Sequence, residues 1–250
     1  MTRILIHAPV GNSAKILILL AEKQLDLPVE KVTVPVDAVL AEVHLASPSA
    51  SLPVLIEEDG SAIAESSVIC EYLNERYSDT PLMSSDVVGR WRTRSWFKFV
   101  NEDLAPATAI LAWQAWTLQS LKESASIALA TRLAHLPVER RLFWEEALAG
   151  FSAARIDQAR SKIAMVAGLI EQALADSPYL AGELFSLADI DVWPFASVLP
   201  RLVPDIVNAD ATPRLMAWIE RVGERPAVRR ATADAQDTDW VPGPEPIRWG

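Results

Sequence analysis

The sequence predicts an α/β domain at the N-terminus followed by an all-α domain. Three observations support this division. The short strand-like segments all precede residue 65, the nine tryptophans all lie from Trp91 onward, and a turn-rich linker with Pro81 separates the two regions at residues 78–85. We therefore expect one domain at residues 1–80 and a second at residues 86–250.

The first 36 residues have the pattern of a parallel βαβ unit. Residues 4–7 form a short apolar run, and Ser13 is a candidate N-cap for the helix that follows. Apolar residues then recur at helical spacing until Pro28 ends the helix. Residues 29–36 alternate as a second strand, which runs parallel to the first if the helix crosses over between them.

An antiparallel hairpin is expected next. Residues 37–51 are weakly patterned and predict an irregular or part-helical connection. Residues 54–57 and 62–64 are apolar, and Asp59-Gly60 between them is a strong signal for a tight hairpin turn. Both strands should therefore lie side by side in one sheet.

A helix completes the predicted α/β domain. Ser66 or Ser67 is expected to cap it, and its apolar face extends to Tyr77. Cys70 falls in the middle of this helix beside apolar residues, which predicts a packing role. The expected order of elements in the domain is βαβαββα.

The second half of the chain shows only helical patterns. These patterns cover residues 86–119, 121–135, 139–175, 187–200 and 212–223, and we expect breaks at Pro137, Pro178, Pro204 and Pro226. Ser186 and Asp189 have the spacing of a capping box at the start of the fourth segment. Residues 236–250 contain three prolines and predict an extended tail.

Composition excludes several classes of function. Half of the 250 residues are hydrophobic and the formal net charge is −10 without a basic cluster, so we expect no nucleic-acid partner. The longest apolar run, residues 16–21, is far shorter than the roughly 20 residues that cross a bilayer, so no membrane partner is expected. A single cysteine rules out an intramolecular disulfide and a multi-cysteine metal site, and predicts a cytoplasmic protein without a metal.

Two short segments could bind an extended, peptide-like ligand. After a cis-proline in Leu52-Pro53-Val54, the backbone of Val54 could pair with a ligand, although a trans proline is the commoner case. Glu65 and Ser66 open the next helix, where free amides and the helix dipole could hold a carboxylate. Simple helix capping would explain the same two residues.

These segments, taken with the order of elements, resemble the glutathione S-transferase superfamily over essentially the whole chain. The motifs that carry the resemblance are LPVL, ESSVICEYL and SLADI. It implies the GST fold, with a thioredoxin-like N-terminal domain and an all-α C-terminal domain, and glutathione as the co-substrate. It also implies that Pro53 is cis, that Val54 pairs with the cysteinyl backbone of glutathione, and that Glu65 and Ser66 hold its γ-glutamyl group.

Enzymes of this superfamily stabilise the glutathione thiolate from the loop after the first strand. In HAPVGNSAK the available donors are Asn12 and Ser13, which we take as the catalytic candidates. No tyrosine lies near this loop, and Val10 occupies the position where thiol-transferring members carry a cysteine. Redox chemistry is therefore disfavoured.

The stretches PVGNSAK and ESSVICEYL, with a long insertion at residues 135–163, resemble the bacterial lignin β-etherases of the LigF type. This implies glutathione-dependent cleavage of β-aryl ethers in lignin-derived aromatic dimers. The aromatic candidates for binding such a substrate are Trp113, Trp116, Trp144 and Phe151. Helical spacing explains these four side chains equally well as core residues.

Two other functions stay open at this point. One is a glutathione transferase or lyase that acts on another aromatic or halogenated electrophile with the same Ser13 and Asn12. The other is a non-catalytic GST-fold protein that binds partners or hydrophobic ligands. A dimer is expected in each case, with Trp91, Phe97 and Val100 as candidate contacts across a two-fold axis or, equally, as core residues.

Overall fold

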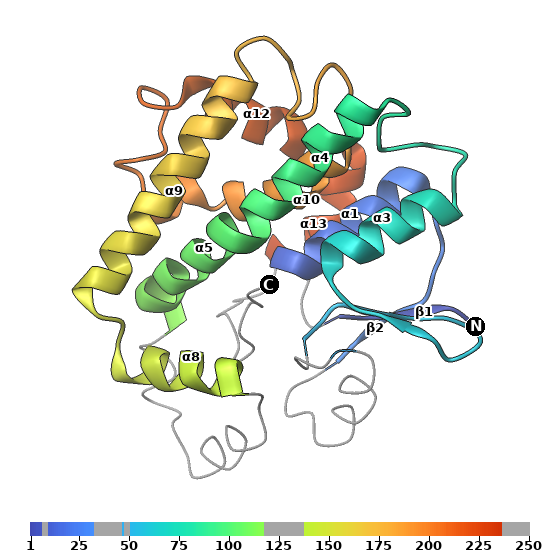
Figure 1. Cartoon of the computed structure of the whole chain (residues 1–250), viewed down its shortest axis with the longest axis horizontal. Coiled ribbons are helices and arrows are strands. Elements are labelled where there is room, and N and C mark those ends of the chain that lie inside the picture. Colours follow the sequence, from blue (N-terminus) through green and yellow to red (C-terminus); the bar gives the residue numbers. More distant parts are fainter. Residues whose placement is uncertain (7–9, 33–46, 48–50, 118–137, 237–250) are drawn as a thin grey trace.

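The computed structural model describes residues 1–6, 10–32, 47, 51–117 and 138–236. Figure 1 shows a small sheet with helices α1 and α3 on one side of it, and a bundle of helices beyond them. The predicted succession of an α/β part and an all-helical part is confirmed. Three predictions fall outside the described residues: the connection at residues 37–51 apart from residues 47 and 51, the helix at residues 121–135, and the tail 236–250 beyond residue 236.

The sheet has four strands in the order β2-β1-β3-β4. They are β1 (Arg3–Ile6), β2 (Val29–Lys31), β3 (Val54–Ile56) and β4 (Ala62–Ile63). β1 and β2 are parallel, and β3 is antiparallel to both β1 and β4. The predicted βαβ unit and the hairpin are thus both confirmed.

Helix α1 (Gly11–Lys23) begins earlier than its sequence predicts. Val10 is its N-cap, so Ser13, the predicted cap, lies inside the first turn and that prediction is wrong. Gly11 has a φ of 51°, a conformation that glycine adopts at little cost, so the chain can turn into the helix two residues before Ser13.

Helix α3 (Ser66–Arg76) is also entered through an unusual backbone. Glu65 occupies its N-cap position with a φ of 70° and makes no side-chain cap. Neither predicted cap is used as one, because Ser66 Oγ donates to Asn12 and Ser67 Oγ donates to Asp191. Both serines instead connect α3 to other parts of the fold.

The helical part begins with one long, nearly continuous run. It consists of α4 (Val87–Phe99), the π-helical turn η1 (Val100–Leu104), α5 (Ala105–Ala112) and a second π-helical turn η2 (Trp113–Thr117). The predicted helix at residues 86–119 corresponds to this run. Phe97 and Val100, two of the candidate dimer contacts, are buried in the core of the chain, whereas Trp91 is 63% exposed.

The later helices differ from the predicted ones in three places. They are α8 (Val138–Ala149), α9 (Ala153–Ala173), α10 (Leu187–Ala196), α11 (Leu199–Leu202), α12 (Pro213–Gly223) and α13 (Pro226–Gln236). A turn at Gly150, with a φ of 90°, splits the predicted helix 139–175, and 187–200 forms two helices. Pro226 was expected to be a break but opens α13, since proline suits the first position of a helix.

The predicted capping box at Ser186 and Asp189 is confirmed. The fully buried Asp189 carboxylate also accepts hydrogen bonds from the Leu180 amide and from Trp218 Nε1. It thereby ties the start of α10 to the preceding loop and to α12. Burial raises the pKa of this carboxyl to about 6, against the opposing effect of these donors.

Helix α1 joins the two parts of the fold. It packs against α3 on one side and against α10 and α13 on another, and Figure 1 shows it in the middle of the molecule. Arg225, just before α13, forms a bidentate ion pair with Glu22 near the end of α1, at 2.6 and 2.8 Å. Among the described residues, no helix is long and apolar enough to cross a membrane.

Candidate functional site

A small cleft lies where the first turns of α1 and α3 meet the entry to β3. Its lining comprises Asn12, Ser51, Leu52, Pro53, Glu65, Ser66 and Asn101. Four of the six residues expected to act on or hold glutathione, Asn12, Pro53, Glu65 and Ser66, are thus brought together. The Leu52–Pro53 peptide bond is cis, as the family resemblance implied.

Asn12 and Ser66 are hydrogen-bonded across the cleft. Ser66 Oγ donates to Asn12 Oδ1 over 3.1 Å, so this bond uses the amide oxygen of Asn12 and not its Nδ2 donors. Both residues lie in the first turn of a helix, where backbone amides without a helical acceptor carry partial positive charge. This end of the cleft is suited to an anion.

Glu65 adds a negative charge beside these donors. Its positive φ is uncommon for a residue with a side chain and places the exposed carboxylate at the mouth of α3. Conformations of this kind cluster at ligand sites, where the surrounding structure holds them. The cleft thus offers an acceptor for a cation next to donors for an anion, which suits the zwitterionic end of an amino acid.

The other two predicted residues, Ser13 and Val54, are not in this lining. Ser13 follows Asn12 in α1, and its side chain is buried. Val54 is fully buried, pairs with Leu5 in the sheet and directly follows the lining residue Pro53. The structure therefore does not bring these two residues into the lining with the other four.

Sequence reasoning missed Asn101, which lines the cleft from the helical part of the chain. It lies in η1, the π-helical turn after α4. Such turns in otherwise regular helices are frequent at functional sites. Only folding brings Asn101 here, within a hydrogen bond of Ser67 in α3, so neither spacing nor periodicity could reveal it.

Cys70 is excluded as a nucleophile by its surroundings. Its side chain is buried in α3. Burial, reinforced by the negative charge of Asp191, raises the pKa of the thiol far above its usual value, although Lys15 opposes the shift. Since only a thiolate attacks, Cys70 is inert at neutral pH, and the predicted packing role is confirmed.

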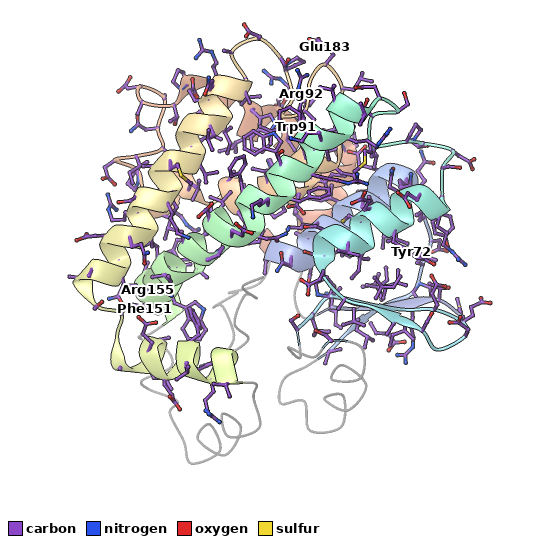
Figure 2. The ribbon with its side chains drawn as sticks, viewed as in Figure 1. Tyr72, Trp91, Arg92, Phe151, Arg155 and Glu183 are labelled. Atoms are coloured by element: carbon purple, nitrogen blue, oxygen red, sulfur yellow. The ribbon has the colours of Figure 1, made fainter. Side chains whose placement is uncertain are left out.

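Three of the four aromatic candidates form one cluster in the core. Trp113 meets Trp144 edge-to-face at 4.8 Å between ring centroids, and Phe151 joins them through Phe143 at 5.5 Å. The turn that carries Phe151 lies between α8 and α9 (Figure 2). Only Trp116 is partly exposed, with the Arg201 guanidinium 4.4 Å from its ring centroid.

Comparison with known proteins finds a matching family model for each of the two parts of the chain. The model of the glutathione S-transferase N-terminal domain matches residues 5–81, and that of the C-terminal domain matches residues 127–226. Protein LigF of Sphingobium sp. strain SYK-6 is 31% identical over 234 residues, which cover 88% of this chain and 89% of LigF.

Solved structures give the same result. The crystal structure of the β-etherase LigF from Sphingobium sp. strain SYK-6 matches with a TM-score of 0.81 at 27% identity, over 93% of this chain and 98% of that one. A glutathione S-transferase from Methylobacterium radiotolerans, in complex with glutathione sulfonate, matches with a TM-score of 0.65 at 25% identity, over 92% and 93%.

Proposed function

The chain belongs to the glutathione S-transferase family, and we propose that it uses glutathione to cleave β-aryl ether bonds in lignin-derived aromatic dimers. Its fold is the GST fold, a thioredoxin-like domain with a mixed sheet followed by a helical domain. Likeness to LigF along 88% of the chain supports the reaction. In this proposal residues 1–80 bind glutathione and residues 86–250 bind the aromatic substrate.

The observation that carries glutathione binding is the cleft between α1 and α3. Glu65 accepts hydrogen bonds from the ammonium of the γ-glutamyl group. The backbone N–H of Ser66, with the other first amides of α3, holds its carboxylate, since the Ser66 hydroxyl already donates to Asn12. The backbone of Val54, after the cis-proline, pairs with the cysteinyl residue. This arrangement points the cysteine sulfur toward the first turn of α1.

Asn12 and Ser13 then stabilise the thiolate. The Nδ2 donors of Asn12, the hydroxyl of Ser13 and the positive end of α1 all favour the charged sulfur over the neutral thiol. The sulfur attacks the carbon next to the ketone, and the ether C–O bond breaks. The bonding pair leaves with the phenolate, which takes a proton from water, so the products are a glutathione thioether and a phenol.

This chemistry asks little of a general acid. The leaving phenol resembles tyrosine, with a pKa of about 10, so the phenolate departs readily as the carbon–sulfur bond forms. Thiolate stabilisation is therefore the main task of the protein in the proposed step.

The aromatic substrate binds beside Trp116. Of the four candidates it alone is partly exposed, with the Arg201 guanidinium over its ring, whereas Trp113, Trp144 and Phe151 are buried in the core. The protein acts as a dimer in this proposal, with the exposed Trp91 in the contact between subunits. Its single, free cysteine suits the reducing cytoplasm.

A phenol-release assay tests the proposal. Purified protein is incubated with glutathione and each enantiomer of a guaiacyl β-aryl ether ketone, and both the phenol and the glutathione thioether are quantified. We expect release that requires glutathione, with one thioether formed for each phenol. Failure to cleave either enantiomer, with conjugation of another electrophile, would reassign the substrate; failure to be retained on immobilised glutathione would overturn the proposal altogether.

A further inference from the structure

A chain of polar groups leads from the cleft into the core between α1, α3 and α10. Asn101 Nδ2 donates to Ser67 Oγ over 3.3 Å, and Ser67 Oγ donates to Asp191 Oδ1 over 2.7 Å. Lys15 Nζ lies 2.9 Å from the same carboxylate oxygen. Lys15, Ser67 and Asp191 are all buried, and only Asn101 reaches the cleft.

Stability alone does not explain a buried ion pair of this kind. Removing two charges from water costs about as much as their attraction returns, and apolar side chains of similar volume often do as well. The pair is also incompletely satisfied, since Asp191 Oδ2 accepts no hydrogen bond from the described residues. Burial raises the pKa of Asp191, while Lys15 and Ser67 oppose the shift and favour its charged form.

The ion pair determines which way the hydrogen bonds run. A serine hydroxyl has one hydrogen, and a carboxylate can only accept, so the Ser67 hydrogen is committed to Asp191. Ser67 Oγ is then left as an acceptor and must receive its second bond from Asn101 Nδ2. This assignment turns Asn101 Oδ1 away from Ser67, and Asn101 is itself a lining residue of the cleft.

We propose that Lys15 and Asp191 are positioning residues that act through Ser67 to present Asn101 Oδ1 to the cleft as an acceptor for the γ-glutamyl ammonium of glutathione. Asn101 then works together with the Glu65 carboxylate in the same lining. The ring of Phe195 on α10, with its centroid 5.2 Å from Lys15 Nζ, helps to hold the Lys15 ammonium in place. The role of the pair rests on the proposed binding of glutathione.

The test replaces the ion pair by apolar residues. In the double variant K15M/D191L the Ser67 hydrogen is free to bond to Asn101 Oδ1, so the amide can reverse and present Nδ2 to the ammonium. Calorimetry should show an approximately 10-fold weaker Kd for glutathione, the loss typical of one hydrogen bond to a charged group. Cysteinylglycine, which lacks the γ-glutamyl group, should bind the double variant as it binds the wild type.

Rescue distinguishes positioning from general damage. Adding N101D to K15M/D191L supplies a side chain with acceptors on both sides, one for Ser67 and one for the ligand, and should restore most of the affinity. Ser67→Ala leaves the ion pair intact and removes only the connecting hydroxyl, so it should weaken glutathione binding to a similar degree. This single variant serves as the test if the double variant does not fold.

Two results would overturn the role of the pair while leaving glutathione binding in place. One is a wild-type Kd in folded K15M/D191L or, where that variant does not fold, in S67A. The other is a loss of affinity that N101D fails to restore. A wild-type protein that does not bind glutathione would instead overturn both this role and the proposed function.

Discussion

The hydroxyl of Ser66 donates a hydrogen bond to Asn12 Oδ1 over 3.1 Å and so joins the first turns of α3 and α1. Two helix N-termini therefore open onto one cleft, and both carry partial positive charge. Two of the anionic groups of glutathione, the thiolate and the γ-glutamyl carboxylate, are stabilised by such an environment. One helix can serve each of them.

Loss of the donors near the thiolate should slow the reaction. Ser13→Ala and Asn12→Ala each remove one donor to a charged sulfur, a contribution of about 1.5 to 3 kcal/mol, so kcat/KM should fall roughly 10- to 100-fold. The pKa of bound glutathione, followed by thiolate absorbance, should rise in parallel. Cys70→Ala is the control and should keep nearly full turnover; an inactive but folded Cys70→Ala beside fully active Ser13 and Asn12 variants would refute the assignment.

We expect the aromatic residues to have two different roles, support of the core and contact with the substrate. Trp144 is buried in the cluster, so Trp144→Ala should lower the free energy of unfolding by about 3 to 5 kcal/mol. Trp144→Phe keeps most of the ring and removes an indole N–H that has no acceptor among the described residues, so it should cost far less. Denaturant unfolding of both variants measures the difference.

Trp116→Ala should instead affect the substrate. Loss of its ring face should raise KM for the aromatic ether by roughly 10-fold, with little change in stability or in KM for glutathione. Steady-state kinetics with each substrate varied in turn provides the measurement. Equal effects on both KM values would show that Trp116 does not contact the aromatic substrate.

The dimer prediction centres on Trp91. Trp91 in α4 and Val68 in α3 are exposed, and the Arg94–Glu71 ion pair links these two helices one turn further along each. Trp91→Glu places a charge at the expected contact and should convert a dimer into a monomer of about 27 kDa in sedimentation experiments. The matched control is Leu142→Glu on α8, which should remain dimeric; a wild-type monomer at micromolar concentration would disprove the contact.

Glu57 should make stability depend on pH. Burial alone would raise the pKa of its carboxyl, but hydrogen bonds from Thr2 and Tyr72 and the charge of Arg76 hold it below the usual value. A carboxyl whose pKa is lower in the folded than in the unfolded chain stabilises the fold above the unfolded pKa, about 4.3, and loses this effect as the pH falls.

Glu57→Gln should therefore be less stable than the wild type by about 1.5 kcal/mol at pH 7, and the difference should shrink as the pH falls below about 4. Urea unfolding of both proteins at pH 7 and at a pH below about 4 measures this difference in stability. The neighbouring Glu58, which is exposed, provides the control substitution Glu58→Gln. A difference of the same size at both pH values would rule out the charge of Glu57 as its cause.

Local sequence patterns predicted the parts of this protein that depend on neighbours along the chain. Asp59-Gly60 indicated the hairpin and Ser186 with Asp189 the capping box, because turns and caps are formed within a few residues. The start of α1 was misjudged since the positive φ of Gly11 cannot be read from periodicity. Pro226 was misread because the same residue can end one helix or begin another.

The same distinction between local and long-range contacts applies to the residues of the site. Asn12, Glu65 and Ser66 lie in short motifs beside predicted helix starts, so the family resemblance indicated them. Asn101 and the Lys15–Asp191 pair could not be found this way. Lys15 and Asp191 are 176 positions apart, and only the packing of α10 on α1 brings them together. A lysine at helical spacing would ordinarily be expected on the solvated face of α1.

The ion pair between Glu22 and Arg225 spans 203 positions and locks α1 to the segment that leads into α13. During synthesis on a ribosome, the sheet and α1 emerge long before their C-terminal partner. The surface of α1 that packs against α13 therefore stays exposed until almost the whole chain has been made. The α/β half expressed alone would expose this surface permanently, so we expect the fragment to aggregate and the intact chain to unfold in one cooperative transition.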